Sequence, residues 1–303
     1  MFRGSFVSKQ SGVALLQVLL LGATMSLLAI RFTETARDQI EIAGQFEGRV
    51  IAQLAAHSAI SEVVFLQLST SVESRLTDQA DDLKVLSDDV ELNFYGAPIR
   101  WGEAVTLRIQ DLNGLLPQIF PQHPLWGRFL TRKLVPEDDI ARYLGVWRDM
   151  QDNDIQSWLL GDVEPQSLPT GQTYPNGLAQ SNKVARWVFA DQPQLAEDIL
   201  EASDVFGTYD TNPFNYSKPL LYSLFDAGVA DEIILMRSQS SPGNRQLNSL
   251  LPAGFRGDYI FDHYSGRLKI DVAIDLGFAS WSERRVIHLQ AGSQPPFRTL
   301  LRN

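Results

Sequence analysis

Cysteine is absent from the 303-residue chain. Its absence excludes disulfide bonds, thiolate nucleophiles and thiolate metal sites. A general attraction to nucleic acid is excluded too, because the formal charge is −10 and no stripe of Lys and Arg carries interleaved aromatic residues. The patterns GxxxxGKS/T, GxGxxG, HExxH and GxSxG are also missing. The sequence therefore contains none of these signatures of nucleotide binding or of zinc and serine hydrolases.

Proline does not occur before Pro98, and no charged residue occurs between Val13 and Ile30. Beyond that uncharged run, apolar residues recur at helical spacing at positions such as Ile40, Phe46 and Val50. We predict one helix from Val13 to about Leu68, roughly 80 Å long at 1.5 Å per residue. Within it, Gly44 and Gly48 mark a bend, a close contact or simply two tolerated helix glycines.

The uncharged run of 18 residues can cross a bilayer, whose hydrocarbon core of about 30 Å needs roughly 17 to 20 helical residues. It follows a short basic leader, residues 1–12, with Arg3 and Lys9 and no acid. A cleaved secretory signal fits poorly, because the apolar core is too long and no small-x-small site follows Ile30. Two other interpretations stay open: an uncleaved signal anchor, or a leader cut after Gly12 so that the helix beginning at Val13 is kept. Loss of the leader would change the net charge from −10 to −12.

The rest of the chain alternates between strand and helix patterns. Strands are expected at residues 90–94, 104–109, 259–261, 267–274 and 284–289, and helices at 138–149, 181–190, 194–202 and 219–225. Residues 111–114 predict a turn, and the tail from Pro295 to Asn303, with two prolines, is expected to be loosely ordered. Strands on both sides of a helical stretch predict a sheet that late strands complete, with the helices inserted.

Five acidic residues form a cluster in the helical stretch: Asp149, Asp152, Asp154, Asp162 and Glu164. Closely spaced carboxylates can supply the six to eight oxygens that Ca²⁺ takes, and Asn176 could add a carbonyl oxygen. A solvated acidic loop is the alternative. The four histidines, His57, His123, His263 and His288, lie far apart in the sequence, so each is expected to be a surface or core residue.

Several stretches, in this order, resemble the general secretion pathway protein K family, the large minor pseudopilins of type II secretion. They are the opening from Lys9 to Leu16, the strand and Asp-x-x-Gly turn of Val105–Leu116, Trp147–Asp149 with Asp152 and Asp154, the turn Tyr174–Gly177, and Phe214–Tyr216 leading into Pro219. The opening is also similar to the leader of pilins and pseudopilins, which a prepilin peptidase cuts after a glycine before it methylates the new N-terminus. The resemblance therefore favours cleavage between Gly12 and Val13.

The resemblance implies an α+β fold in which a pilin-like long N-terminal helix packs on an antiparallel sheet with an inserted α-helical domain. It implies a leader at 1–12, a transmembrane part at 13–30, a pilin-like domain at 31–114 and 237–303, and the insertion at 115–236. It also implies a non-catalytic protein at the tip of a pseudopilus, spanning the bacterial inner membrane once with its C-terminal domain in the periplasm. The implied partners are minor pseudopilins of the I and J types, the major pseudopilin and the prepilin peptidase, and calcium is implied as a possible ligand of the acidic cluster.

With Val13 as mature residue one, Gln17 is residue five, where most pilin-like subunits carry a glutamate that neutralises a neighbour's N-terminal amine. An unpaired carboxylate in an apolar bundle is costly. A subunit with no neighbour beyond it is better served by a neutral amide, although Gln17 can also be a tolerated polar residue. Two other functions stay open: a minor pilin of a type IV pilus, and a membrane-anchored periplasmic hydrolase using Asp149 and Asp154 as acid and base.

Overall fold

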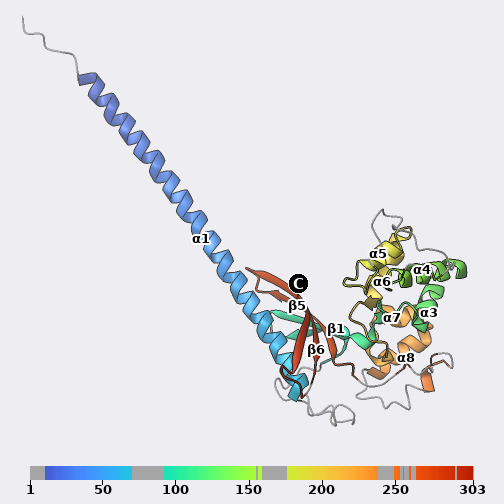
Figure 1. Cartoon of the computed structure of the whole chain (residues 1–303). Helices are drawn as coiled ribbons and strands as arrows, with labels where there is room; N and C mark the ends of the chain where they lie inside the picture. The colour runs from blue at the N-terminus through green and yellow to red at the C-terminus, as the bar shows by residue number, and fades with distance from the viewer. Residues whose placement is uncertain are drawn as a thin grey trace, which may run out of the picture. The chain divides into compact units, whose positions relative to one another are not determined.

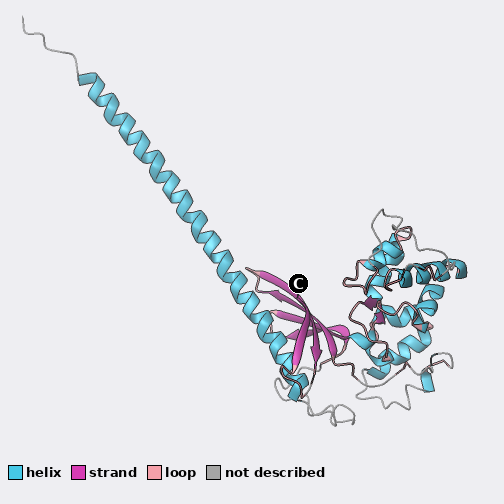
Figure 2. Ribbon diagram, viewed as in Figure 1, coloured by secondary structure: helices cyan, strands magenta, loops and turns pink. Residues whose placement is uncertain are grey.

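The computed structural model describes residues 11–69, 92–154, 156–158, 176–237, 249–252, 255, 259–260, 264–290 and 292–302. Its elements form an α+β fold with a long N-terminal helix, an antiparallel sheet, and a block of helices between the second and third sheet strands along the chain (Figures 1 and 2). This confirms the expected fold class and order of elements. The domain bounds stay predictions. By their contacts, the residues divide into two compact units, Met1–Leu54 with Asp275–Trp281, and Ala55–Ile274 with Ser282–Asn303.

The first element, α1 (Ser11–Ser69), is a single helix of 59 residues. At 1.5 Å per residue it is roughly 90 Å long. No proline removes a backbone donor along it, which confirms the helix expected from Val13 to about Leu68. Near its end, Ala56, Ile60 and Val63 are buried at spacings of four and three residues, so they lie on one face.

The sheet contains five strands in the order β1-β2-β5-β6-β7 (Figure 2). Their bounds are β1 (Tyr95–Trp101), β2 (Val105–Asp111), β5 (Arg267–Asp275), β6 (Ser280–Leu289) and β7 (Phe297–Arg302). Strand β2 pairs antiparallel with β5 from Val105 opposite Ile274 to Asp111 opposite Leu268. Buried and exposed residues alternate, with Leu107 and Ile109 buried and Thr106 and Arg108 exposed, as one-sided burial of a sheet requires. Trp101 also donates a hydrogen bond from Nε1 to the Glu62 carboxylate of α1 at 3.1 Å.

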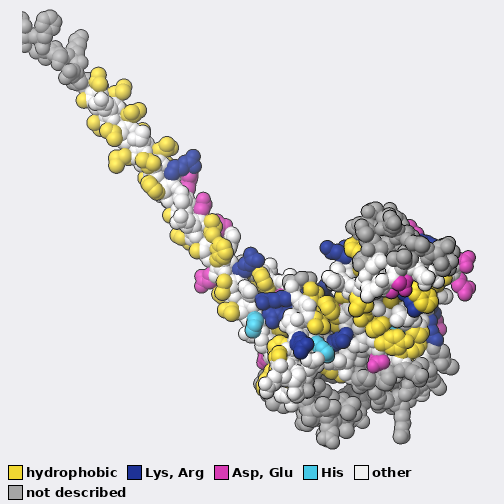
Figure 3. All heavy atoms as spheres, viewed as in Figure 1, with side chains coloured by type: hydrophobic (Ala, Val, Ile, Leu, Met, Phe, Trp, Pro, Cys, Tyr) yellow, Lys and Arg dark blue, Asp and Glu magenta, His cyan; other side chains and the backbone are white. Residues whose placement is uncertain are grey.

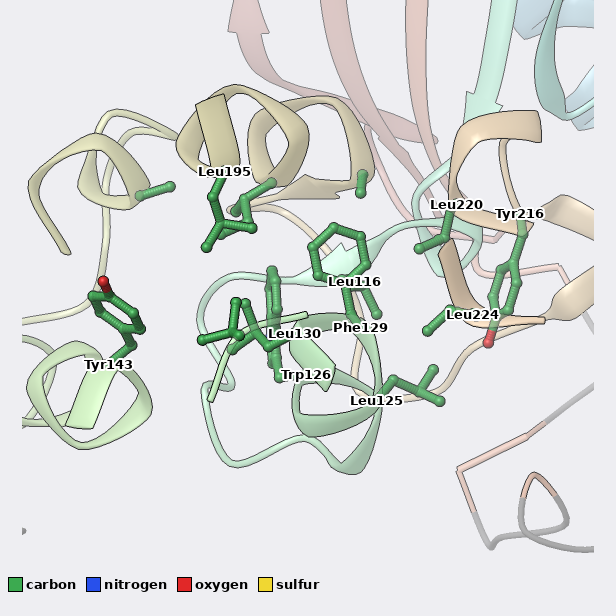
Figure 4. Close-up of a cluster of buried hydrophobic side chains, with 14 of the residues drawn as sticks. Leu116, Leu125, Trp126, Phe129, Leu130, Tyr143, Leu195, Tyr216, Leu220 and Leu224 are labelled. Atoms are coloured by element: carbon green, nitrogen blue, oxygen red, sulfur yellow. The ribbon is translucent and has the colours of Figure 1, made fainter. Parts of the chain in front are cut away.

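The helical block has a hydrophobic core of its own (Figure 4). Its main elements are α3 (Pro124–Arg132), α4 (Glu137–Asp149), α5 (Val184–Val188), α6 (Pro193–Ala202), α7 (Lys218–Leu224) and α8 (Ala227–Arg237). Short elements join them: η2 (Leu112–Gly114), β3 (Leu116–Pro117), β4 (Ser203–Asp204) and η3 (Pro213–Asn215). The Trp126 and Trp147 rings lie 4.7 Å apart, and Phe189 meets Trp147 edge-on at 5.7 Å. Such large buried rings carry much of the apolar area that stabilises a block of short helices.

Four sequence expectations need correction. No strand covers residues 92–94; β1 begins at Tyr95, where Gly96 has a φ of +77° and a register shift precedes Pro98. The predicted helix 181–190 is reduced to α5, and of the predicted strand 259–261 the described residue Ile260 forms one isolated bridge with Thr211. The tail expected to be loose contains β7, which pairs antiparallel with β6.

Gly48 is a point of close contact inside the first compact unit. A Cβ atom at this position would lie 2.8 Å from the Cβ of Ala279 and 3.2 Å from the Phe278 ring, in the turn between β5 and β6. A Cβ atom added at Gly44, one helical turn earlier, would have nothing within 4 Å. Of the alternatives for the two glycines, close contact therefore applies to Gly48 and tolerance to Gly44.

We expect Gly48→Ala to destabilise the protein relative to Gly44→Ala. Both changes gain about 1 kcal/mol of helix propensity. Only the first forces the turn at residues 276–279 to move, and overpacking of this kind costs roughly 1–3 kcal/mol. Urea unfolding of the full chain in detergent micelles measures the difference. Equal stability of the two variants would contradict the close contact.

Candidate functional site

The most unusual surface of the molecule is the first part of α1. Every residue from Val13 to Ile30 is exposed, including large apolar side chains such as Leu16, with an exposed fraction of 66%. Figure 3 shows apolar side chains along this stretch of the helix before the first charged groups. Those are Arg31 and Glu34, which form an exposed ion pair at 3.2 Å. An apolar surface of this extent marks a membrane or a protein partner.

Within the described part of the chain, α1 is the one helix long and apolar enough to cross a membrane. Its length and composition meet the requirement of roughly 20 residues for the hydrocarbon core. The described residues thus contain a single candidate for a membrane span, near the N-terminus.

Gln17 lies on this exposed stretch, and its side chain makes no hydrogen bond to any residue that the structure describes. A buried amide without a partner costs a few kcal/mol, whereas an isolated carboxylate costs far more. Gly12 and Val13 lie in the first turn of α1. Cleavage between them, and the role of Gln17, remain predictions.

The acidic cluster is described in part. Asp149, the last residue of α4, is buried, and its carboxylate accepts hydrogen bonds from the Trp158 backbone N–H at 2.9 Å and the Ser157 hydroxyl at 3.0 Å. Asp154 accepts from the Gln156 backbone N–H at 2.8 Å, and Asn176 donates to the Asp154 carbonyl at 3.2 Å. These contacts hold residues 157–158 against the end of α4, and Gln156 and Asn176 against Asp154.

Asp162 and Glu164 lie outside the described residues. The described residues include Asp149, Asp152 and Asp154. They contain no group of three or more His, Cys, Asp or Glu side chains that is placed to hold a metal ion. Two donors already engage the Asp149 carboxylate, so these residues do not by themselves form a calcium site. The same bonds make Asp149 a link between the end of α4 and residues 157–158. A calcium site stays a prediction that depends on Asp162 and Glu164.

A buried polar network forms where β2 ends. The Asp111 carboxylate accepts hydrogen bonds from the Asn113 backbone N–H at 3.1 Å, from the Ser265 backbone N–H at 3.0 Å and from the Ser265 hydroxyl. Asn215 of η3 donates to it at 3.4 Å and to the Asn113 side chain at 2.9 Å. Burial raises the pKa of Asp111 to about 6, while the hydrogen bonds from Ser265 and from the Asn113 backbone oppose the rise.

Gly114 lets the two segments meet in this network, because a Cβ there would lie 1.9 Å from the Asn215 carbonyl oxygen. Gln110 donates to that same carbonyl at 2.7 Å. The sequence marked the Asp-x-x-Gly turn and Asn215 as separate motifs. The structure joins them, so both serve to attach the helical block to the sheet.

The histidines that the structure describes are a buried one and two at the surface. His57 is exposed, and His288 is partly exposed on β6. His123 is buried and precedes α3: its Nδ1 accepts from the Leu125 backbone N–H at 3.3 Å, and its Nε2 lies 3.0 Å from the Tyr209 carbonyl. Burial lowers the pKa of His123 to about 4. His263 lies outside the described residues.

No protein-family model matches the sequence, and no curated protein matches it either. Among solved structures, the chain is similar to a chain of the GspK–GspI–GspJ complex from the type 2 secretion system of enterotoxigenic Escherichia coli. The identity is 11% and the TM-score 0.48, over 84% of this chain and 99% of that chain.

Acid should weaken the protein through His123. Because its folded pKa of about 4 lies below the ordinary 6.5, folding favours the neutral ring. The stabilisation that the neutral His123 ring contributes to the folded state is therefore complete above pH 6.5 and is lost as the pH falls towards 4. Asp111, whose pKa is raised, has the opposite effect: its protonation stabilises the folded state as the pH falls from about 6 to 3.8. A comparison of the wild type with a variant that lacks only the imidazole cancels the effect of Asp111.

We expect His123→Asn, which keeps a helix-capping side chain, to remove this sensitivity to acid. Between pH 7 and pH 4.5, the free energy of unfolding of the wild type should fall by on the order of 2 kcal/mol more than that of the variant. Urea unfolding at the two pH values measures this difference. Parallel pH profiles would show that His123 does not titrate as its burial requires.

If the acidic cluster binds calcium, titration calorimetry of the full chain should show one Ca²⁺ equivalent. The pair Asp162→Asn with Glu164→Gln should weaken binding by at least roughly tenfold, because each neutral side chain removes a preferred anionic ligand. The matched control is Glu137→Gln with Asp138→Asn in the first turn of α4, which removes the same charge. No heat of binding in the wild type, or an equal loss in both pairs, would rule out the site.

Proposed function

We propose that the chain is a minor pseudopilin that caps and helps to initiate the periplasmic pseudopilus of a bacterial type II secretion system. The observation that carries the proposal is the exposed, uncharged stretch Val13–Ile30, which directly follows the basic leader and belongs to the same helix as the buried Ile60 and Val63. A removable signal would not need to be continuous with the helix of a globular domain. A helix that stays attached can serve first as a membrane anchor and then as a subunit contact.

The charges around this stretch suggest its orientation. Arg3 and Lys9 lie before it, and basic residues favour the cytoplasmic side. The protein would then cross the inner membrane once, with the residues after Arg31 in the periplasm. On leaving the membrane for a pseudopilus, the apolar stretch would pack against the same part of neighbouring subunits, since no described residue of its own chain covers it.

Gln17 supports a position at the tip of the pseudopilus. A glutamate at this place needs a neighbour's amine, because an unpaired charge in an apolar bundle is expensive. An amide is neutral and can remain where no further subunit follows. The helical block between β2 and β5 adds bulk that subunits packed side by side along a shaft would have to accommodate, which also favours the end of the fibre.

The proposed partners follow from this position. They are minor pseudopilins of the I and J types, the major pseudopilin below them, and the prepilin peptidase, which would cut after Gly12 and methylate Val13. The proposed role is structural, and it assigns no reaction to any residue.

We expect Gly12→Leu to leave the leader attached and to abolish secretion, because a leader peptidase that cuts after glycine cannot accept a bulky side chain at that position. Gly22→Leu is the matched control: it places the same side chain in the same apolar stretch, where nothing lies within 4 Å. Intact mass spectrometry of the membrane fraction should find the wild type and the control beginning at methylated Val13, and Gly12→Leu beginning at Met1.

Two results would contradict the proposal. A wild-type chain that begins at Met1, or normal processing of Gly12→Leu, would exclude maturation by this route. Labelled protein distributed along the whole fibre would leave the class of protein in place but exclude the position at the tip.

A further inference from the structure

Two exposed arginines lie on neighbouring strands. Arg100 of β1 and Arg108 of β2 are both exposed, and neither forms an ion pair or side-chain hydrogen bond among the described residues. The register places Arg100 opposite Thr106 and Arg108 opposite Pro98, so the two arginines are diagonal neighbours. Diagonal neighbours on one face of an antiparallel pair lie about 7–8 Å apart, within reach of long side chains.

A third arginine extends the group across the sheet. Arg108 faces Asp271 of β5 in the register. The carboxylate of Asp271 is engaged by Arg284 of β6, which donates to it from Nε at 2.5 Å and from Nη2 at 3.2 Å. Arg100, Arg108 and Arg284 therefore form one arginine patch over four adjacent strands, in which Asp271 bonds to Arg284 and Asp204 also acts on Arg284 through its charge. Figure 3 shows Lys and Arg side chains over the strands that Figure 1 labels.

The surroundings leave the patch accessible. The residues that lie between or beside these arginines on the same face are small and exposed; they are Pro98, Thr106 and Ala273. Glu103, in the turn after β1, is exposed and forms no ion pair in the described part of the chain. Like charges on neighbouring strands repel one another, so folding gains nothing from placing Arg100 beside Arg108.

We propose that the arginine patch is a docking surface for an acidic segment of another protein. Planar guanidinium groups hold carboxylates through paired hydrogen bonds, and an array of them on a flat sheet suits a run of Asp or Glu side chains. The docking surface does not depend on the proposed role in secretion.

The test uses the full chain in detergent micelles with a fluorescein-labelled octaglutamate peptide as the probe, and fluorescence anisotropy at low salt as the measurement. We expect octaglutamate to bind and octaglutamine not to bind. Arg100→Gln with Arg108→Gln should weaken binding by roughly fivefold or more, as expected when two exposed ion pairs are lost. The control pair, Arg37→Gln with Lys183→Gln, removes two other exposed cations that form no ion pair with any described residue, and it should change binding by less than about twofold.

The melting temperature is the second readout. Removing two cations that repel each other should leave it unchanged or raise it, so a clear fall would show that the arginines are structural and would overturn the proposal. An equal loss of binding in both pairs of variants would show that the peptide responds only to the net charge of the protein, which would also overturn the proposal. Displacement of the peptide by inorganic phosphate at an equal concentration of charge would identify a general anion site instead of a protein surface.

Discussion

The attachment of the helical block to the sheet depends on one buried carboxylate. Strands β2 and β5 are neighbours in the sheet, yet residues 112–266 separate them in the chain, so the chain must leave the sheet and return to the same place. Asp111 holds both ends of this excursion: it accepts from Asn113 just after β2 and from Ser265 just before β5. Asn215, from the middle of the excursion, donates to the same group. Several donors around one carboxylate offset the cost of burying it, and they fix three segments in a single arrangement.

Much of the fold follows from periodicity. The absence of proline and the spacing of apolar residues predicted α1 almost to the residue, and α4, α6 and α7 appear close to their expected places. Strand β7 was missed because Pro295 and Pro296 resemble the start of a disordered tail, although both lie just before the strand. Gly96 and Pro98 break the alternation of β1, and the helical patterns of α3 and α8 went unrecognised. These errors share a cause, because pairing with a distant strand or packing against a distant helix overrides the local signal.

The site was predictable to a lesser degree. The uncharged run from Val13 to Ile30 is visible in the sequence alone, and the structure leaves it exposed. The sequence placed Asp149 in a group of equivalent acidic residues, whereas the structure buries it and uses it to hold Trp158. The join between Asp111 and Asn215 could not be foreseen, since residues 104 positions apart show no periodic relation. The position of Arg100 diagonally beside Arg108 on one face could not be foreseen either, because it depends on the register of β1 on β2.

The pairing of β2 with β5 also bears on how the chain acquires its structure as it is made from the N-terminus onward. Strands β1 and β2 would emerge as a hairpin whose edge has to wait for more than 150 further residues. Pairing across such a separation is slow, and an unpaired strand edge invites aggregation. The helical block, whose core draws on residues within its own span, can become compact during this wait. Its early compaction would bring residue 265 back towards Asp111 and shorten the time for which the hairpin stands alone.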